Sequence, residues 1–369
     1  MKNYNINVFY FLIILFFTII FLTNNFHNYK EILIFGGADG YSYYEISKYS
    51  PYKAEVEIQA IHSERFLIPY FLGFLKNLTN LDIIFLYRIS TCVLIFLICL
   101  QTFKIIKLKE FDFSYNISIA LFALIIFNPY ITRFYIANPL IVNDLFFVYG
   151  SLIAINGIDK KSRKTLFTGL IIAAIARQSA VAILLSMILV NFSMKSDFIS
   201  FKKILVSIFI LVIIYTIGFI YSSLVPQEGT RANSYYITLF GLLTENKSFN
   251  EILIFFIWPF LSFGPLILFF LIFFKGFRIK KERLELSYFI LFYCIFIIIQ
   301  PILQGVGVSG KNIIRLTTFS FIPILILIFI NFELRKKSKI KLIIFMTIIS
   351  LWTCHPTFSK FSFFKNIIF

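Results

Sequence analysis

A polar stretch near the start of the chain gathers residue types that can do chemistry. Residues 36–73 read GGADGYSYYEISKYSPYKAEVEIQAIHSERFLIPYFLG and include Asp39, Glu45, His62 and Arg65. A carboxylate or an imidazole can accept a proton from a hydroxyl group, and a guanidinium can bond two oxygens of an anion at once. These side chains predict a site for proton transfer beside an anionic group.

The local sequence predicts that these side chains meet at the membrane surface. The glycines of GGADG allow a tight turn that brings Asp39 back toward the membrane, and the Tyr rings that follow suit an interface. In a helix over GYSYYEISKYS, Glu45 lies roughly a turn and a half from Asp39, so both border one pocket. In the tetrapeptide HSER, His62 and Arg65 lie directly before an apolar stretch that is expected to be a helix.

The elements that must position these residues are membrane helices. Hydrophobic residues make up 59% of the 369 residues and charged residues 14%. Apolar runs of about 15–22 residues recur along the chain, as a bilayer core of roughly 30 Å demands. The net charge of +17 comes from Lys and Arg in short connectors, which argues against a nucleic-acid partner. We expect an all-α, polytopic transmembrane protein in which residues 1–369 form a single membrane domain.

The hydropathy pattern predicts about nine full spans and one re-entrant hairpin. The first span is expected to be a retained signal anchor, because no small-residue cleavage site follows it. Residues 23–82 then form a large outer loop with surface helices, since the apolar stretch 66–76 is too short to cross. The predicted spans are residues 8–22, 83–103, 116–131, 139–158, 204–224, 252–274, 284–303, 317–332 and 341–353.

Basic connectors predict the orientation of these spans. By the positive-inside rule they face the cytoplasm, so the N-terminus is cytoplasmic and the outer loop faces the opposite side. The compact loops favour a bacterial inner membrane. The connectors concerned are residues 104–109, 159–164, 194–203, 275–283 and 333–341.

The hairpin is predicted at residues 165–192, which join two basic connectors. A single crossing would place one connector on the wrong side, whereas two half-helices meeting near ARQSA (176–180) satisfy both. Such a break is tolerated only where the backbone is buried in protein or lines a watery cavity. Arg177 at the hairpin tip is flanked by IIAAIA and SAVAILL, and an arginine in such surroundings is by default functional.

Together these motifs resemble those of the multi-spanning GT-C glycosyltransferases, which use polyprenyl-phosphate sugars as donors. The resemblance rests on a first helix, DGYSYYEI in the outer loop, HSERFLIPYFLG before the next helix and AIARQSA in the hairpin. It covers about residues 1–192 and implies a GT-C-like fold. It also implies a cell-envelope glycosyltransferase whose partners are membrane lipid, a polyprenyl-phosphate sugar and a glycan, lipid or protein acceptor at the periplasmic face.

The resemblance also implies roles for individual residues. Asp39 becomes the general base that takes the proton of the acceptor hydroxyl, with His62 as a second catalytic residue. No paired acidic motif is present, because Gly40 and Tyr41 follow Asp39, so we expect no metal cofactor. The residues expected to bind substrate, mainly as cations for the departing lipid phosphate, are Glu45, Arg65, Arg177, Arg231, Lys311 and Arg315.

Two alternatives also handle lipid-linked sugars. A lipid-linked oligosaccharide flippase or transporter usually shows internal repeats and charges in several helices, whereas this sequence shows no repeat and gathers its acids in an outer loop. An O-antigen polymerase or ligase typically carries its large loop and its arginines late in the chain. Here the later loop at 225–251 is modest beside the first.

Overall fold

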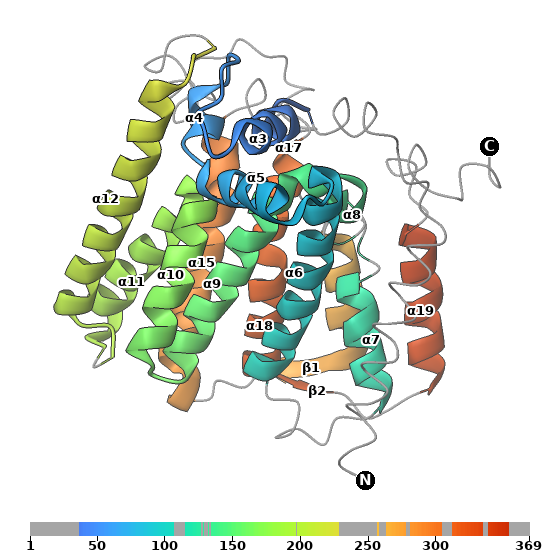
Figure 1. Ribbon diagram of the computed structural model, residues 1–369. Coiled ribbons are helices and arrows are strands. Elements are labelled where there is room, and N and C mark those ends of the chain that lie inside the picture. Colours follow the sequence, from blue (N-terminus) through green and yellow to red (C-terminus); the bar gives the residue numbers. More distant parts are fainter. Residues whose placement is uncertain are drawn as a thin grey trace.

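The protein is a bundle of helices in the computed structural model (Figure 1). Helices make up most of the described chain, as expected for an all-α membrane protein. The predicted first span at residues 8–22 lies outside the described residues. The structure describes residues 37–106, 115–126, 134–196, 198–228, 263–277, 281–304, 312–334 and 339–353, and the single residues 128, 132 and 257.

Four of the described helices are long and apolar enough to cross a membrane, judged by length and composition. A helix of 20 residues, such as the fourth, is about 30 Å long and matches the apolar core of a bilayer. All four lie where the sequence predicts spans. They are α6 (Ile83–Ile106), Pro139–Asp159, which joins η2 (Pro139–Ile141) to α9 (Val142–Asp159), α12 (Phe201–Leu224) and α15 (Leu284–Leu303).

Shorter helices occupy the remaining predicted spans in the described part of the chain. Because their apolar helical parts have 17 residues or fewer, against the roughly 20 that a bilayer requires, the number of nine spans stays a prediction. They are α7 (Tyr115–Ile126), the apolar helix Phe263–Phe273, the run of α17 (Asn312–Thr317), η5 (Thr318–Ser320) and α18 (Phe321–Asn331), and α19 (Lys339–Thr353).

A helical hairpin occupies the region of the predicted re-entrant segment. It consists of α10 (Arg163–Ala176) and α11 (Val181–Met194), which run in opposite directions on either side of Arg177 and η3 (Gln178–Ala180) (Figure 1). Each helix has 14 residues and is about 21 Å long, so each is longer than half of a bilayer core. The pair is therefore deeper than the two half-helices that the sequence predicts.

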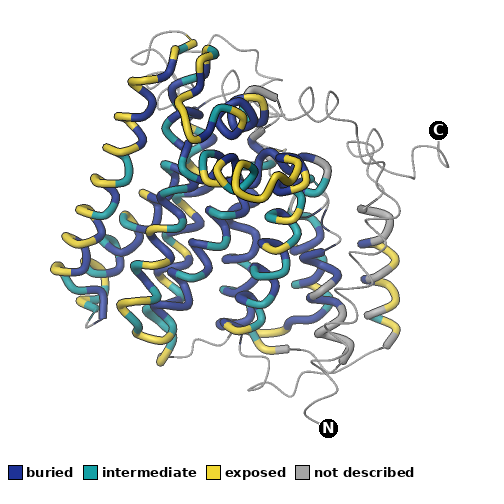
Figure 2. The backbone as a smooth tube through the Cα atoms, in the orientation of Figure 1, coloured by how far each residue is buried: buried dark blue, intermediate teal, exposed yellow. Residues whose placement is uncertain are grey.

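Close packing of α9 against α10 forms the centre of the bundle. A Cβ atom at Gly150 would lie 2.5 Å from the backbone nitrogen of Ala173, and one at Gly169 would lie 2.3 Å from that of Ala154. Small residues at both positions let the two backbones approach, as is common between membrane helices. Of the most apolar 18-residue stretch in Pro139–Asp159, 83% is buried inside the protein, whereas the corresponding share in α12 is 28%. Figure 2 shows the exposed residues along α12, which therefore lies at the periphery.

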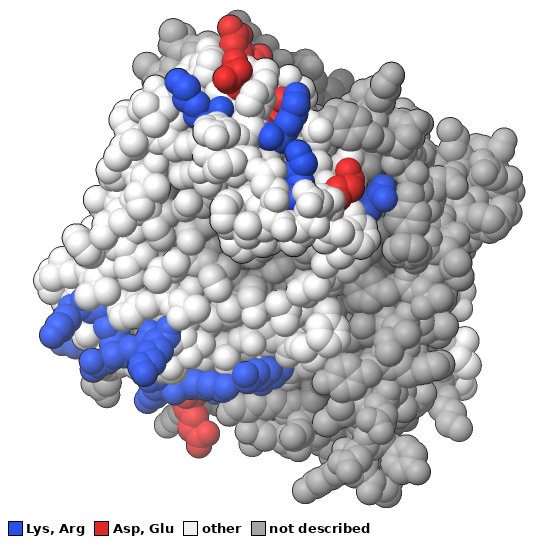
Figure 3. All heavy atoms as spheres, viewed as in Figure 1, with Lys and Arg blue, Asp and Glu red and all other residues white. Residues whose placement is uncertain are grey.

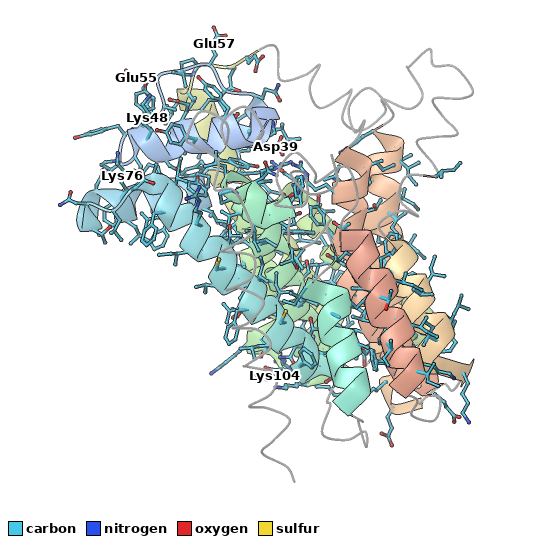
Figure 4. All side chains as sticks on the ribbon, turned by 90° about the vertical axis from the view of Figure 1, so that its right-hand side faces the viewer. Asp39, Lys48, Glu55, Glu57, Lys76 and Lys104 are labelled. Carbon is cyan, nitrogen blue, oxygen red and sulfur yellow. The ribbon has the colours of Figure 1, made fainter. Side chains whose placement is uncertain are left out.

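A layer of short helices covers one end of the bundle. It is formed by α3 (Gly37–Tyr49), α4 (Ala60–Ser63) and α5 (Leu67–Thr79), and α5 lies across the bundle rather than along it (Figures 1 and 4). This is the orientation expected for the short apolar stretch 66–76. The Ser47 hydroxyl holds the layer on the bundle, since it donates to the Pro69 carbonyl oxygen at 2.8 Å and lies 2.6 Å from the Tyr87 hydroxyl. We call this layer the cap.

Charged side chains separate to the two ends of the molecule. Lys and Arg form a band along the lower edge of Figure 3, and the waist above it carries almost no charged side chains on the face shown. Lys104 lies at that lower end, whereas Glu55 and Glu57 lie at the cap (Figure 4). Arg283 is 3.9 Å from Asp159 at the lower end, which brings two of the basic connectors together. The charges thus outline an apolar belt, although which end faces the cytoplasm stays a prediction.

One feature departs from a purely helical chain. Strands β1 (Phe274–Phe277) and β2 (Phe332–Leu334) form an antiparallel pair at the basic end of the bundle. β1 follows the helix Phe263–Phe273 and β2 follows α18. Because these two helices end close together, the backbone groups of β1 and β2 pair with each other. The predictions of a span to residue 274 and another to residue 332 were wrong in this detail.

Candidate functional site

Six charged or titratable side chains come together beneath the cap. Each comes from a different helix, turn or helix break, and the segments are far apart in sequence. We call this group the charged cluster: Asp39 of α3, His62 of α4, Arg65 just after α4, Asp144 of α9, Arg177 at the hairpin tip and Arg315 of α17.

Asp39 is the cluster residue nearest the solvent at the cap. It lies in the first turn of α3, where a carboxylate interacts favourably with the helix dipole, and its side chain is 15% exposed. Arg315 donates through Nη2 to Asp39 Oδ2 at 2.7 Å, and His62 Nε2 lies 3.3 Å from Asp39 Oδ1. The two carboxylate oxygens thus face a guanidinium and an imidazole.

Burial and charge decide the protonation of these two groups. Burial disfavours the charged form of Asp39, but the charges of Arg315 and of the neighbouring cations outweigh it and hold the pKa of Asp39 well below its usual range. Burial lowers the pKa of His62 to about 4, although the carboxylate of Asp39 opposes the shift. At neutral pH the pair therefore consists of an ionised carboxylate and a neutral imidazole.

Asp144 is a residue of the charged cluster that the sequence analysis missed. Its side chain has no exposed surface, and it forms ion pairs with Arg177 through Oδ1 and with Arg315 through Oδ2, the latter at 3.4 Å from Nε. The Tyr135 hydroxyl donates to Oδ2 at 3.2 Å. An Asp inside the predicted span 139–158 was the available signal, because ionisable residues within membrane helices mark functional sites.

Arg177 occupies the break between α10 and η3. Its backbone is extended (φ −155°, ψ 145°), which ends α10 and turns the side chain toward α9. The guanidinium carbon lies 5.1 Å from the centre of the Phe319 ring, a distance at which a cation is attracted to an aromatic face. Arg177 is thus held by a carboxylate and an aromatic ring, and it is buried at the hairpin tip, where the sequence predicts it.

Arg65 is joined to the hairpin tip by a neutral network. Its Nε donates to Gln178 Oε1 at 2.6 Å, and its Nη1 donates to the Tyr43 hydroxyl at 3.4 Å. Gln178 in turn donates to Glu64 Oε2 at 3.1 Å, and Asn143 donates to the Arg65 carbonyl oxygen at 3.1 Å. The pKa of Arg65 is raised, because Tyr43 and the two cluster carboxylates outweigh the cost of burial.

Some polar atoms of the cluster are buried without a hydrogen-bond partner in the part of the chain that the structure describes. They are Nδ1 of His62 and Nε of Arg177, whereas Nε of Arg315 makes no hydrogen bond but lies 3.4 Å from Asp144 Oδ2 in their ion pair. Buried donors and acceptors are normally satisfied, so these two atoms are candidates for contacts with a ligand or a water molecule. The Arg177 atom is a guanidinium donor, which suits an anion.

The remaining predicted site residues lie elsewhere. Glu45 accepts a hydrogen bond from Lys48 at 3.3 Å, so its carboxylate pairs within α3 and not with the cluster. Arg231 and Lys311 lie outside the described residues. Within the described ranges, no three His, Cys, Asp or Glu side chains form a group that could hold a metal ion.

Comparisons with known protein families, with curated proteins and with solved structures give no significant match to this chain. The geometry of the charged cluster is therefore the basis for assigning its chemistry.

Proposed function

We propose that the protein is a membrane glycosyltransferase that moves a sugar from a polyprenyl-phosphate donor to a hydroxyl acceptor at the capped end. The GT-C resemblance of the sequence suggests this reaction, and the charged cluster has the chemistry that it needs. A transfer of this kind requires a group that accepts the hydroxyl proton and cations that stabilise the departing lipid phosphate.

The observation that carries the proposal is the charge balance of the cluster. The six cluster residues comprise three guanidiniums (Arg65, Arg177 and Arg315), two carboxylates (Asp39 and Asp144) and a neutral His62, so these six carry one surplus positive charge. Glu64 is not one of these six residues and accepts a hydrogen bond from the Gln178 amide. The surplus positive charge and the unpartnered Nε donor of Arg177 fit a phosphodiester, which carries one negative charge.

The position of the cluster also supports a lipid-linked donor. α5 borders the capped end and exposes the apolar side chains Phe71, Phe74 and Leu78. A helix of this kind lies in the membrane interface, where the phosphate of a polyprenyl lipid is also found. The donor phosphate would then reach the arginines while its hydrocarbon tail stays in the bilayer.

Arg315 couples donor binding to proton transfer in this mechanism. While Arg315 pairs with Asp39, the pKa of Asp39 stays low and the carboxylate is a weak base. A donor phosphate that takes over Arg315 weakens this pair, raises the pKa of Asp39 and makes it a stronger base. The acceptor oxygen then attacks the anomeric carbon, its proton passes to Asp39, and the bond from that carbon to the phosphate oxygen breaks. The bond's electron pair leaves on the phosphate, facing Arg177 and Arg315.

The experiment is a transfer assay with the full-length protein in proteoliposomes and radiolabelled polyprenyl-phosphate sugars. We expect release of polyprenyl phosphate, and we expect Asp39→Asn to lower the rate by about 10²- to 10⁴-fold, since that is the typical contribution of a general base. Glu45→Gln is the matched control, because this acid lies on the same helix but pairs with Lys48. Activity of Asp39→Asn within a few fold of wild type would remove Asp39 from the mechanism.

The transporter alternative gives a different result in the same vesicles. A flippase moves the lipid-linked sugar between leaflets without releasing polyprenyl phosphate. Among the described residues the buried charged side chains lie near the cap, except Lys203 of the connector 194–203 and Asp159 of the connector 159–164, which favours chemistry at one face over passage through the bundle. Movement of the intact lipid, with no transfer, would replace the glycosyltransferase by this alternative.

A further inference from the structure

We propose that Asp144 is a positioning residue that holds Arg177 and Arg315 side by side so that both can contact one phosphate group. This inference rests on the proposed function, because it concerns how the same cluster binds its donor. Asp144 is more deeply buried than Asp39 and acts on the donor through the two arginines.

The geometry around Asp144 is that of a shared counter-ion. Each carboxylate oxygen pairs with a different arginine, Oδ1 with Arg177 and Oδ2 with Arg315. The Tyr135 hydroxyl also donates to Oδ2, so the carboxylate cannot rotate without losing a partner. Three separate segments, α8 (Phe134–Ala137), the hairpin tip and α17, thus converge on one side chain of α9.

The two arginines differ in what else holds them. Arg177 also packs on the ring of Phe319, whereas Arg315 also pairs with Asp39 at the partly exposed side of the cluster. Asp144 has no exposed surface, so it is the partner that an incoming anion cannot displace. Asp39 is the exchangeable partner of Arg315, and Asp144 is the fixed one.

Without Asp144 the arginines would repel each other. Three guanidiniums would then be opposed by one carboxylate, and like charges in a partly desolvated site are unfavourable. Asp144 lowers this repulsion and fixes the directions of the Arg177 and Arg315 guanidiniums, including the unpartnered Nε of Arg177. A bidentate or shared phosphate contact depends on such directions, because the guanidinium donors are rigidly arranged.

A purely structural role makes different predictions, and α9 itself supplies a control. Asp159 lies at the other end of this helix and is also buried beside an arginine, with Arg283 Nε at 3.9 Å. Replacement of either Asp by Asn removes one negative charge from a buried ion pair. Only Asp144 lies beside the proposed phosphate site.

The test measures binding of farnesyl phosphate, with farnesol as the uncharged control, to the purified full-length protein in a neutral detergent. We expect Asp144→Asn to bind farnesyl phosphate about 10- to 150-fold more weakly, the loss typical of a misplaced hydrogen bond to a charged group. Asp159→Asn should bind it with wild-type affinity. Farnesol binding should stay the same in all variants.

An effect of net charge alone would change the affinity for farnesyl phosphate in the opposite direction. Removal of a carboxylate makes the cluster more positive, so a site that depended only on net charge would bind phosphate more tightly in Asp144→Asn. Asp144→Glu separates the two explanations further, since it keeps the charge but moves the carboxylate by one methylene group. Positioning predicts a loss in this variant too, and unchanged or tighter binding in both variants would overturn the proposal.

A milder variant covers the case in which Asp144→Asn does not fold. Tyr135→Phe removes a single hydrogen bond to Asp144, and we expect weakening of about 3- to 10-fold. Tyr293→Phe is its control, because this buried hydroxyl lies 3.0 Å from Ser151 Oγ in the middle of α9. Equal affinities of the two variants would overturn the positioning role, whereas a wild-type protein that does not bind farnesyl phosphate would overturn the proposed function itself.

Discussion

Replacement of Arg177 by Lys tests whether the hairpin tip binds phosphate. Both side chains carry one positive charge, but the guanidinium has five donors in a fixed fork and the ammonium is a point charge. Arg177 already uses Nη1 for Asp144, and its Nε has no partner among the described residues. A lysine at this position has three donors, but all lie on one nitrogen, so it cannot place separate nitrogens on Asp144 and on a phosphate as the guanidinium does.

The expected magnitude follows from the contacts that Lys cannot make. A lost hydrogen bond to a charged group is worth about 1.5–3 kcal/mol, or about 10- to 150-fold in an equilibrium or a rate. The Lys variant also loses part of the cation–π attraction between Arg177 and the Phe319 ring, which is worth about 0.5–2 kcal/mol. We expect the combined loss of binding energy to appear as a higher KM for the donor with a smaller change in kcat, because Arg177 contacts the phosphate when the donor binds.

The assay compares donor-dependent rates and membrane abundance of wild type, Arg177→Lys and Arg177→Ala. Arg283→Lys is the matched control, since Arg283 faces Asp159 at the opposite end of α9. An anchoring role for Arg177 predicts normal donor kinetics in the Lys variant and low abundance of the Ala variant. Normal kinetics of Arg177→Lys at normal abundance would refute the phosphate-binding role.

The pH dependence of stability and the sidedness of the connectors give two more predictions. Because the pKa of His62 falls from 6.5 in the unfolded chain to about 4 in the fold, the unfolded state binds the extra proton between these values, and acidification from pH 7 to pH 5 should lower the stability by about 2 kcal/mol. Thermal unfolding in detergent should show this loss in wild type but not in His62→Gln, and an equal loss in both would contradict it. An impermeant thiol reagent should label Lys161→Cys and Lys195→Cys from the same side of the membrane and Glu55→Cys from the other. Labelling of the first two from opposite sides would contradict the hairpin.

Much of the architecture could be predicted from local patterns. The span predicted at 284–303 coincides with α15, and the stretch 66–76, too short to cross, lies across the end of the bundle as α5. A break near ARQSA was predicted because two basic connectors had to lie on the same side of the membrane, and α10 does end directly before Arg177. These predictions succeed because helix length, apolar composition and the placement of Lys and Arg are properties of consecutive residues.

Other features could not be predicted from consecutive residues. The pairing of β1 with β2 depends on two helix ends that lie far apart in the sequence meeting at the basic end. Arg315 was expected to bind substrate, but its pairing with Asp39, 276 residues away in the sequence, could not be predicted and arises because α17 brings the two together. Asp144 was overlooked among the apolar residues of its span, although its burial and its two arginines make it central to the cluster.

The sequence by itself determined that the chain is helical and apolar, where its long helices run and which connectors are basic, because the bilayer imposes these features on each segment separately. It also drew attention to Asp39, His62, Arg65 and Arg177 through their residue types. Only the tertiary structure decided which charge pairs with which. The energy of a buried charge depends on partners a few ångströms away in space, and here those partners come from segments that the chain separates by up to 276 residues.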